Sequence, residues 1–190
     1  QEEETEVWDQ SELEEFTSRV YEIPAELDTF INSTSTSEKY SSEEFIIMGR
    51  NREAMLLFDL RQIPEDAKQI VLRTYSHWGP GNELSFSIVE DYQSVNSKVN
   101  YLSGIEHSEE VARYHINSES NAEAVADISK SLMTETDITE LVKNYRAEHP
   151  LATRICLYIM EPDVSNCTEI WSTENPFGIQ YGPTLVVTVE

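Results

Sequence analysis

Glycine is scarce in this chain, with 6 among 190 residues, and no glycine-rich phosphate-loop motif occurs. A phosphate-binding loop depends on such a motif, because backbone N–H groups must approach the phosphate closely. The apolar runs also fall short of the roughly 20 residues that a transmembrane helix needs. The sequence therefore contains neither a phosphate loop nor a transmembrane helix.

Basic residues are few as well. The chain has 13 Lys and Arg against 36 Asp and Glu, which gives a net charge of -23. Such a field repels nucleic-acid phosphates and anionic membrane surfaces, so we exclude nucleic acid as a main partner. An acidic surface also suits a protein that must stay soluble outside the cell. The length and the 39% of hydrophobic residues predict one domain with its own core.

The residue sets of common enzymes are missing. No HExxH spacing and no metal-binding cysteine pair accompanies the histidines, which are His77, His107, His115 and His149. No GxSxG nucleophile motif occurs. Pairs of carboxylates arise by chance among 36 acidic residues, so they do not indicate glycoside hydrolysis. The sequence predicts a protein that is not an enzyme.

Only two cysteines are present, Cys156 in an apolar run and Cys167 just before another. A turn region around Pro162 lies between them, so the two runs can form a hairpin that places the thiols opposite each other. An exported compartment would permit a disulfide between them. The alternative is two unpaired thiols, one of them buried.

Short strand-like runs fill most of the chain. They are bounded by turn residues, and several alternate between apolar and polar side chains. The clearest runs are 27–31, 45–49, 54–60, 70–76, 84–90, 154–160, 168–172 and 184–189, and weaker ones are 101–102, 112–116 and 124–128. This pattern predicts an all-β fold over residues 25–190, a jelly-roll-type β-sandwich with one or two short helices.

Two segments show helical spacing instead. Ile138, Leu141 and Tyr145 fall on one helical face after Asp137 or Thr136, either of which can cap the helix. Residues 1–24 form an acidic leader in which apolar residues from Leu13 to Val20 are spaced for a short amphipathic helix ending before Pro24. This helix packs on its own domain or docks on a partner.

The first residues, Gln1-Glu2-Glu3-Glu4, resemble the sequence that follows the lipidated cysteine of Bacteroidetes surface lipoproteins. The resemblance implies an exported protein at the cell surface or on the outer face of the outer membrane, in contact with the membrane only through a lipid anchor. The alternative is a solvated acidic tail.

A longer resemblance follows from the order of several motifs. A strand like Asp28-Thr29-Phe30-Ile31 is followed by a strand ending in Gly49, by the signature run from Arg52 to Leu60, and by Ile63-Pro64. An aspartate-led helix at 137–142, an apolar strand at 155–160 and the close at 182–187 come later. In this order the motifs resemble the DNRLRE domain, grouped with carbohydrate-binding module family 96.

The resemblance covers residues 27–190 and implies an extracellular β-jelly roll that binds polysaccharides such as alginate without catalysis. The chain departs from the family pattern between Asp91 and Lys130, a section that aligns poorly. Any ligand site that the family holds in this section is in doubt here.

Sugar binding needs flat aromatic faces and polar groups for hydroxyls. Trp78 stands beside a Gly/Pro turn and is the leading aromatic candidate, either as an exposed platform or as a ring folded onto the core. The other aromatic candidates are Tyr75, Tyr92, Tyr101, Trp171 and Tyr181. An anionic glycan would need basic side chains, for which Lys39, Arg50 and Arg52 are candidates, unless neighbouring carboxylates pair with them.

Calcium is the one cofactor that the acidic loops suggest, because carboxylate oxygens are its usual ligands. The candidate ligands are Asp28, Asp59, Asp137 and Asp163, but no Asp-x-Asp-x-Asp-Gly loop is present. Asp59 fits a turn position and Asp137 a helix cap equally well.

The sequence leaves a second class of function open. A lipoprotein of this size can be an accessory scaffold subunit of an outer-membrane complex for nutrient import or assembly, or an adhesin or fibre subunit. A large exposed apolar patch without a groove would favour the scaffold. A groove lined by Trp78, tyrosines and arginines would favour polysaccharide binding.

Overall fold

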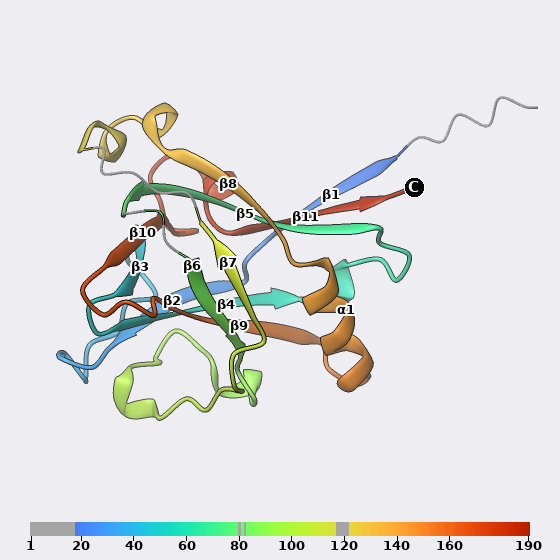
Figure 1. Cartoon of the computed structure of the whole chain (residues 1–190), viewed down its shortest axis with the longest axis horizontal. Coiled ribbons are helices and arrows are strands. Elements are labelled where there is room, and N and C mark those ends of the chain that lie inside the picture. Colours follow the sequence, from blue (N-terminus) through green and yellow to red (C-terminus); the bar gives the residue numbers. More distant parts are fainter. Residues whose placement is uncertain (1–17, 80, 82, 117–121) are drawn as a thin grey trace, which may run out of the picture.

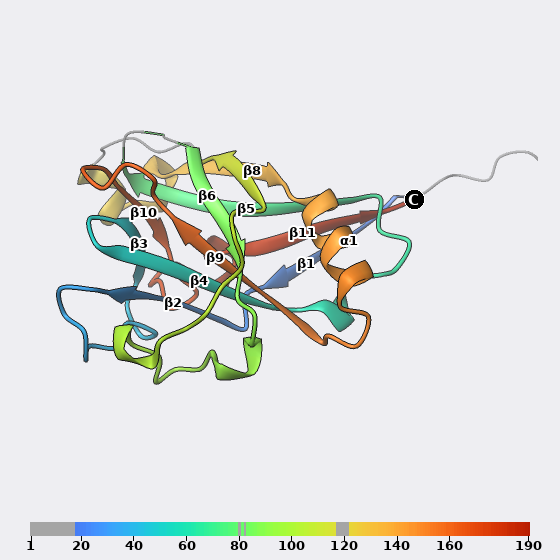
Figure 2. The same cartoon turned by 60° about the horizontal axis from the view of Figure 1, so that its bottom comes forward.

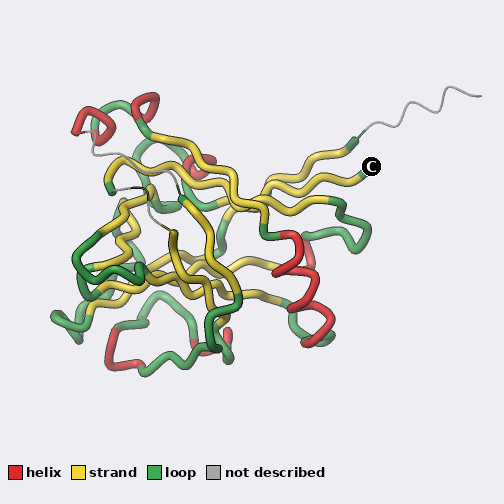
Figure 3. The backbone as a smooth tube through the Cα atoms, in the orientation of Figure 1, coloured by secondary structure: helices red, strands yellow, loops and turns green. Residues whose placement is uncertain are grey.

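The computed structural model describes residues 18–79, 81, 83–116 and 122–190. Within these residues, eleven strands form one antiparallel sheet that curls strongly into a half-barrel, with a single short α-helix at one end (Figures 1 and 3). The predicted mostly-β fold is confirmed at this level.

The strands are β1 (Arg19–Pro24), β2 (Leu27–Asn32), β3 (Phe45–Gly49), β4 (Arg52–Asp59), β5 (Gln69–Trp78), β6 (Glu83–Ile88), β7 (Ala112–His115), β8 (Leu132–Asp137), β9 (Arg154–Met160), β10 (Cys167–Trp171) and β11 (Thr184–Val189). The α-helix is α1 (Thr139–Glu148). Short 3₁₀ helices are η2 (Leu60–Gln62), η3 (Tyr92–Ser94), η4 (Tyr101–Ser103), η5 (Ala122–Val125), η6 (Ile128–Lys130) and η7 (Ile179–Tyr181).

The curled sheet has two halves (Figure 2). In one half, β5 pairs with β8, β10 and β11. On their other sides, β11 pairs with β1 and β10 pairs with β3. In the other half, β4 lies between β2 and β9, followed by β6 and β7. The pair Gly49–Arg52 at the β3–β4 turn joins the halves. This turn is therefore a corner where the sheet changes direction.

Strand alternation gives the sheet two buried faces. Along β4, Ala54, Leu56 and Phe58 pack into the main core between the halves, whereas Met55 and Leu57 belong to a smaller cluster on the opposite face. This follows from the two-residue period of a strand. The loop between β6 and β7 supplies Val89, Val95 and Val99 to the smaller cluster and so covers part of that face.

The eight clearest strand predictions are confirmed, and so is the predicted strand near 112–116. The predictions at 101–102 and 124–128 are wrong, because η4, η5 and η6 occupy these segments. Strand β8 was not predicted. Its inward-facing side chains are Thr134 and Thr136 rather than apolar residues, so the alternation is not visible as hydrophobicity.

The predicted leader helix lies mostly outside the described residues. Its last position, Val20, lies in strand β1, which pairs with β11 from Arg19 onward. The sheet thus begins inside the segment that was predicted to be leader.

The predicted helix is confirmed as α1, and it buries Leu141, Val142 and Tyr145. Asp137 ends β8, and its Oδ1 accepts a hydrogen bond from the backbone N of Thr139 at 3.0 Å. Among the described residues, no helix is long and apolar enough to cross a membrane.

Candidate functional site: a groove beside the β3–β4 turn

Most arginines of this acidic protein are already engaged. Four of them pair with carboxylates: Arg61 with Asp59, Arg73 with Glu22, Arg113 with Glu110, and Arg154 with Glu26 and Asp59. Arg146 donates to backbone carbonyls instead. Arg50 and Arg52 form no ion pair with any described residue. Arg50 Nε donates to the backbone O of Ser165 and Arg52 Nη1 to the backbone O of Arg50, each at 3.4 Å. Two unpaired guanidinium groups at one turn form a local basic spot in a chain of net charge -23.

The backbone of the β3–β4 turn fixes these two side chains. Arg50 and Asn51 both have positive φ, 51° and 71°, as a two-residue type I′ hairpin requires. Gly49 precedes them at φ 99°, and a Cβ there would lie 2.2 Å from the carbonyl oxygen of Asn166. Asparagine suits this turn, but arginine rarely adopts positive φ. Such residues often mark functional sites, since the strain must be offset elsewhere.

The turn closes one end of a groove of about 540 Å³. Its floor is sheet: Met160 of β9 lies opposite Ser85 of β6, which lies opposite Arg113 of β7. Residues in one such row point to the same face of an antiparallel sheet. The floor therefore continues the smaller buried face, at the point where the β6–β7 loop stops covering it.

Tyr101 forms a wall of the groove and is 43% exposed. It lies on η4, within the β6–β7 loop. That loop is held to the β2–β3 loop by Leu102 N donating to Thr36 O at 3.3 Å and by Asn100 Nδ2 donating to Ser37 O at 3.2 Å. These bonds fix the loop segment that carries Tyr101 beside the groove.

Three carboxylates also line the groove, and one of them, Glu110, is already paired with Arg113. Glu53 accepts a hydrogen bond from the Tyr158 hydroxyl, and burial together with this glutamate raises the pKa of Tyr158 far above its usual value. Glu161 is 7% exposed, and its Oε1 accepts from the backbone N of Asp163 at 3.0 Å. Its Oε2 has no hydrogen-bond partner among the residues that the structure describes. The groove therefore combines donors for an anion with acceptors for hydroxyl groups.

The structure brings three of the predicted candidates together, Arg50, Arg52 and Tyr101. Trp78, at the end of β5, is 41% exposed but does not line the groove. Lys39 is exposed in the β2–β3 loop, and Tyr181 packs edge-on against Tyr75 with ring centroids 5.2 Å apart.

Three further charged residues of the groove, Arg113, Glu53 and Glu161, were not predicted as site residues. Strand pairing brings Arg113 to the groove from β7, and Glu161 follows Met160 of β9, so no spacing in the sequence reveals these two. Glu53 stands next to Arg52 in the chain and could have been found from that proximity.

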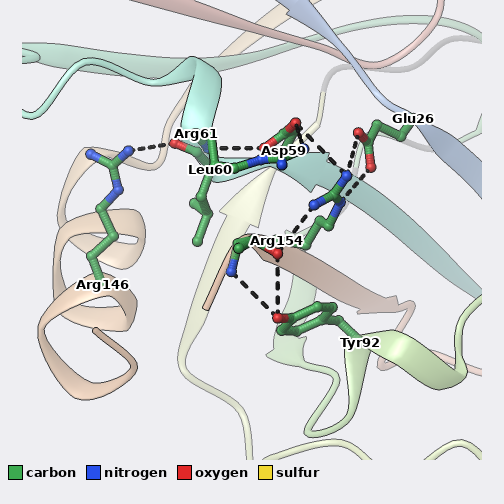
Figure 4. A network of polar contacts seen from close by, with 8 residues as sticks. Glu26, Asp59, Leu60, Arg61, Tyr92, Arg146 and Arg154 are labelled. Carbon is green, nitrogen blue, oxygen red and sulfur yellow. Dashed lines mark hydrogen bonds and ion pairs between the residues drawn. The ribbon is translucent and has the colours of Figure 1, made fainter. Parts of the chain in front are cut away.

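Tyr92 belongs to a polar network that ties β9 to its neighbours (Figure 4). Its hydroxyl lies 3.5 Å from Thr153 Oγ1 and accepts from Thr153 N, and these contacts lower its pKa. Arg154 Nε pairs with Glu26 at 2.9 Å, close to the Asp59–Arg61 pair. The network accounts for Tyr92 as a residue that holds the fold.

The four aspartates considered for calcium occupy separate parts of the fold: Asp28 lies in β2, Asp59 and Asp137 end β4 and β8, and Asp163 follows β9. Arg61 holds the pKa of Asp59 well below its usual range, with Arg154 adding to the effect. Asp28, Asp137 and Asp163 accept hydrogen bonds from the backbone N of Thr173, Thr139 and Ser165. No group of three potential metal ligands occurs in the described part of the chain.

The predicted hairpin is wrong, and of the two alternatives for the cysteines the structure shows the unpaired thiols. Cys156 lies in β9, between β4 and β6, whereas Cys167 lies in β10, between β3 and β5. Both thiols are free and buried. Burial raises the pKa of each thiol, so neither is an activated nucleophile.

Comparison with protein-family models and with curated proteins finds no match for this chain, so the DNRLRE resemblance stays a prediction.

Proposed function

We propose that the chain is a non-catalytic module that binds an anionic polysaccharide in the groove beside the β3–β4 turn. The observation that carries the proposal is the pair Arg50 and Arg52, which face the groove without a carboxylate partner among the described residues. Guanidinium groups bind carboxylate and sulfate oxygens through paired, charge-assisted hydrogen bonds.

The other groups of the groove suit a sugar. Tyr101 offers a partly exposed ring against which a pyranose can lie, and Glu53 and Glu161 offer acceptors for hydroxyl groups. The groove is open rather than enclosed, which suits one stretch of a longer chain. Trp78 is outside this proposed site.

We further propose that the curled sheet is a β-sandwich of the jelly-roll type. Support comes from the two sheet halves, which meet at the Gly49–Arg52 pair and enclose the main core between them. The resemblance to DNRLRE domains supports the same architecture, and with it a place at the cell surface.

Binding of the chain to immobilised alginate, polygalacturonate and a neutral glucan tests the proposal. We expect retention on an anionic polymer, and a loss of about tenfold for Arg50→Ala and for Arg52→Ala, because a charge-assisted hydrogen bond contributes about 1.5 kcal/mol or more. Lys39→Ala is the matched control, since it removes one exposed positive charge outside the groove and should bind normally.

Two results would count against the proposal in different ways. Undiminished binding by both arginine variants would contradict the assignment of the site to this groove but not the proposed polysaccharide binding. No binding to any polysaccharide would remove the function and favour a scaffold subunit, which co-purification of partners from the source membrane would then reveal.

A further inference from the structure

A second hollow lies far from the β3–β4 turn, between α1 and strands β6 and β7. It has a volume of about 480 Å³, within the usual range of small-molecule sites, and about 310 Å³ more opens beside it along Val89 and Glu90. Figure 1 shows β7 crossing in front of the curled sheet toward α1. The hollow thus lies at the edge of the half-barrel.

Helix α1 presents two parallel ridges to this hollow. Leu141, Tyr145 and His149 follow each other at four-residue spacing, and so do Glu140, Asn144 and Glu148. Residues four apart stack along one side of a helix. The first ridge is mainly apolar and aromatic, with Leu141 and Tyr145 buried, whereas the second is polar and exposed.

The opposite wall is also apolar. Ala112 and Tyr114 of β7 and the half-exposed Val111 face the helix, with Ile88 below them. Tyr114 is fixed by an edge-on contact with Phe86, whose ring centroid lies 5.0 Å away. The hollow is therefore a slot with apolar sides and a row of polar groups along one rim.

The two carboxylates of the rim have no positive partner among the described residues. The basic side chains of the helix point elsewhere: Lys143 lines a separate hollow beside η2, and Arg146 donates to the carbonyls of Leu60 and Ile63 at 2.6 and 2.5 Å. At 1.5 Å per residue, Glu140 and Glu148 are about 12 Å apart along the helix, with Asn144 midway.

We propose that this slot binds a linear polyamine, with its methylene segments against Leu141, Tyr145 and Val111. A terminal ammonium group pairs with Glu140, the other with Glu148, and a central ammonium donates to the Asn144 amide oxygen. An apolar chain with positive charges at these intervals matches both the walls and the rim. The partly exposed ring of Tyr114 adds cation–π attraction.

Calorimetric titration of the full chain with spermidine at pH 8 and about 0.15 M salt, where nonspecific attraction is screened, tests the proposal. We expect binding of one molecule per chain. Glu140→Gln and Glu148→Gln should each weaken it about two- to fivefold, as for an exposed ion pair. Putrescine, which is too short to reach both carboxylates, should bind more weakly.

Control variants distinguish binding in the slot from nonspecific electrostatic attraction of the polyamine to an acidic protein. Glu38→Gln removes the same charge from an exposed position in the β2–β3 loop and should leave binding unchanged. Asn144→Arg places a cation between the two glutamates on an exposed helix position and should abolish binding, while Ser42→Arg adds the same charge elsewhere and should not.

Absence of binding at this salt concentration would overturn the proposal. So would an equal loss in Glu38→Gln and the two helix variants, or full binding by Asn144→Arg with a native circular-dichroism spectrum. None of these results bears on polysaccharide binding at the other groove.

Discussion

Asp28 makes the stability of this protein depend on pH, and the direction of the effect follows from its surroundings. It lies on β2, is 2% exposed, and its Oδ2 accepts from the backbone N of Thr173 at 2.8 Å. Its Oδ1 has no partner among the described residues. Burial, with a further contribution from Glu174, raises the pKa of Asp28 from 3.8 to about 7, although the Thr173 bond opposes the rise.

An acid whose pKa is raised by folding holds its proton more tightly in the native state. Between about pH 4 and pH 7 the native protein therefore binds more protons at this site than the unfolded chain does, and stability falls as the pH rises. At about 1.4 kcal/mol per pKa unit, the full effect is about 4 kcal/mol, and about 2–3 kcal/mol of it falls between pH 5 and pH 8.5.

The substitution Asp28→Asn removes this titration. The amide oxygen can still accept from Thr173 N, whereas the buried NH₂ group lacks a partner, which costs about 1–3 kcal/mol at every pH. We therefore expect the stability of the variant relative to the native protein to increase by about 2–3 kcal/mol from pH 5 to pH 8.5. Urea unfolding followed by tryptophan fluorescence measures this difference.

Two further variants sharpen the test. Asp66→Asn removes an exposed carboxylate, so it controls for the general change in charge and should show no such slope. Glu174→Gln removes the neighbouring charge and should reduce the slope of the native protein. A difference between Asp28→Asn and the native protein that stays constant across this pH range would refute the reasoning.

Three other predictions concern the fold. Gly49→Ala should lower the free energy of unfolding by at least about 2 kcal/mol, measured from the urea midpoint, because positive φ and the Asn166 carbonyl both oppose a Cβ; a neutral result would contradict the turn geometry. Arg146→Met should cost about 2 kcal/mol, because it removes the guanidinium donor of Ile63 O and one of the two donors of Leu60 O, and an unchanged thermal midpoint would disprove this. Cys156 should react with a thiol reagent only after unfolding, so rapid labelling of the native protein at this residue would show that β9 is less buried than described.

Apolar alternation made most strands predictable, because a half-buried strand must place every second side chain in the core. The same logic failed for β8, where threonines face inward, and for η4, where Leu102 is apolar yet 69% exposed. The alternation of apolar residues reports the preferences of single side chains for burial in a strand. Tertiary packing decides which segments other parts of the chain actually bury.

The candidate site was predictable only in part. Arg50 and Arg52 stand two residues apart in one turn, so their proximity is local. Arg113 and Tyr101 reach the same groove from β7 and from the β6–β7 loop, through strand pairings that no local pattern encodes. The predicted hairpin between the two cysteine-bearing runs is wrong for the same reason, since β9 and β10 are consecutive in the chain but separated in the sheet by β3 and β4.

The sequence by itself determined an acidic, mostly-β protein and the helix at α1, because charge, alternation and turn residues act locally or as sums over the chain. Only the tertiary structure decided which cations remain unpaired and which side chains share a groove. These properties depend on strand order and register, and a shift of one residue in register turns a side chain to the opposite face of the sheet.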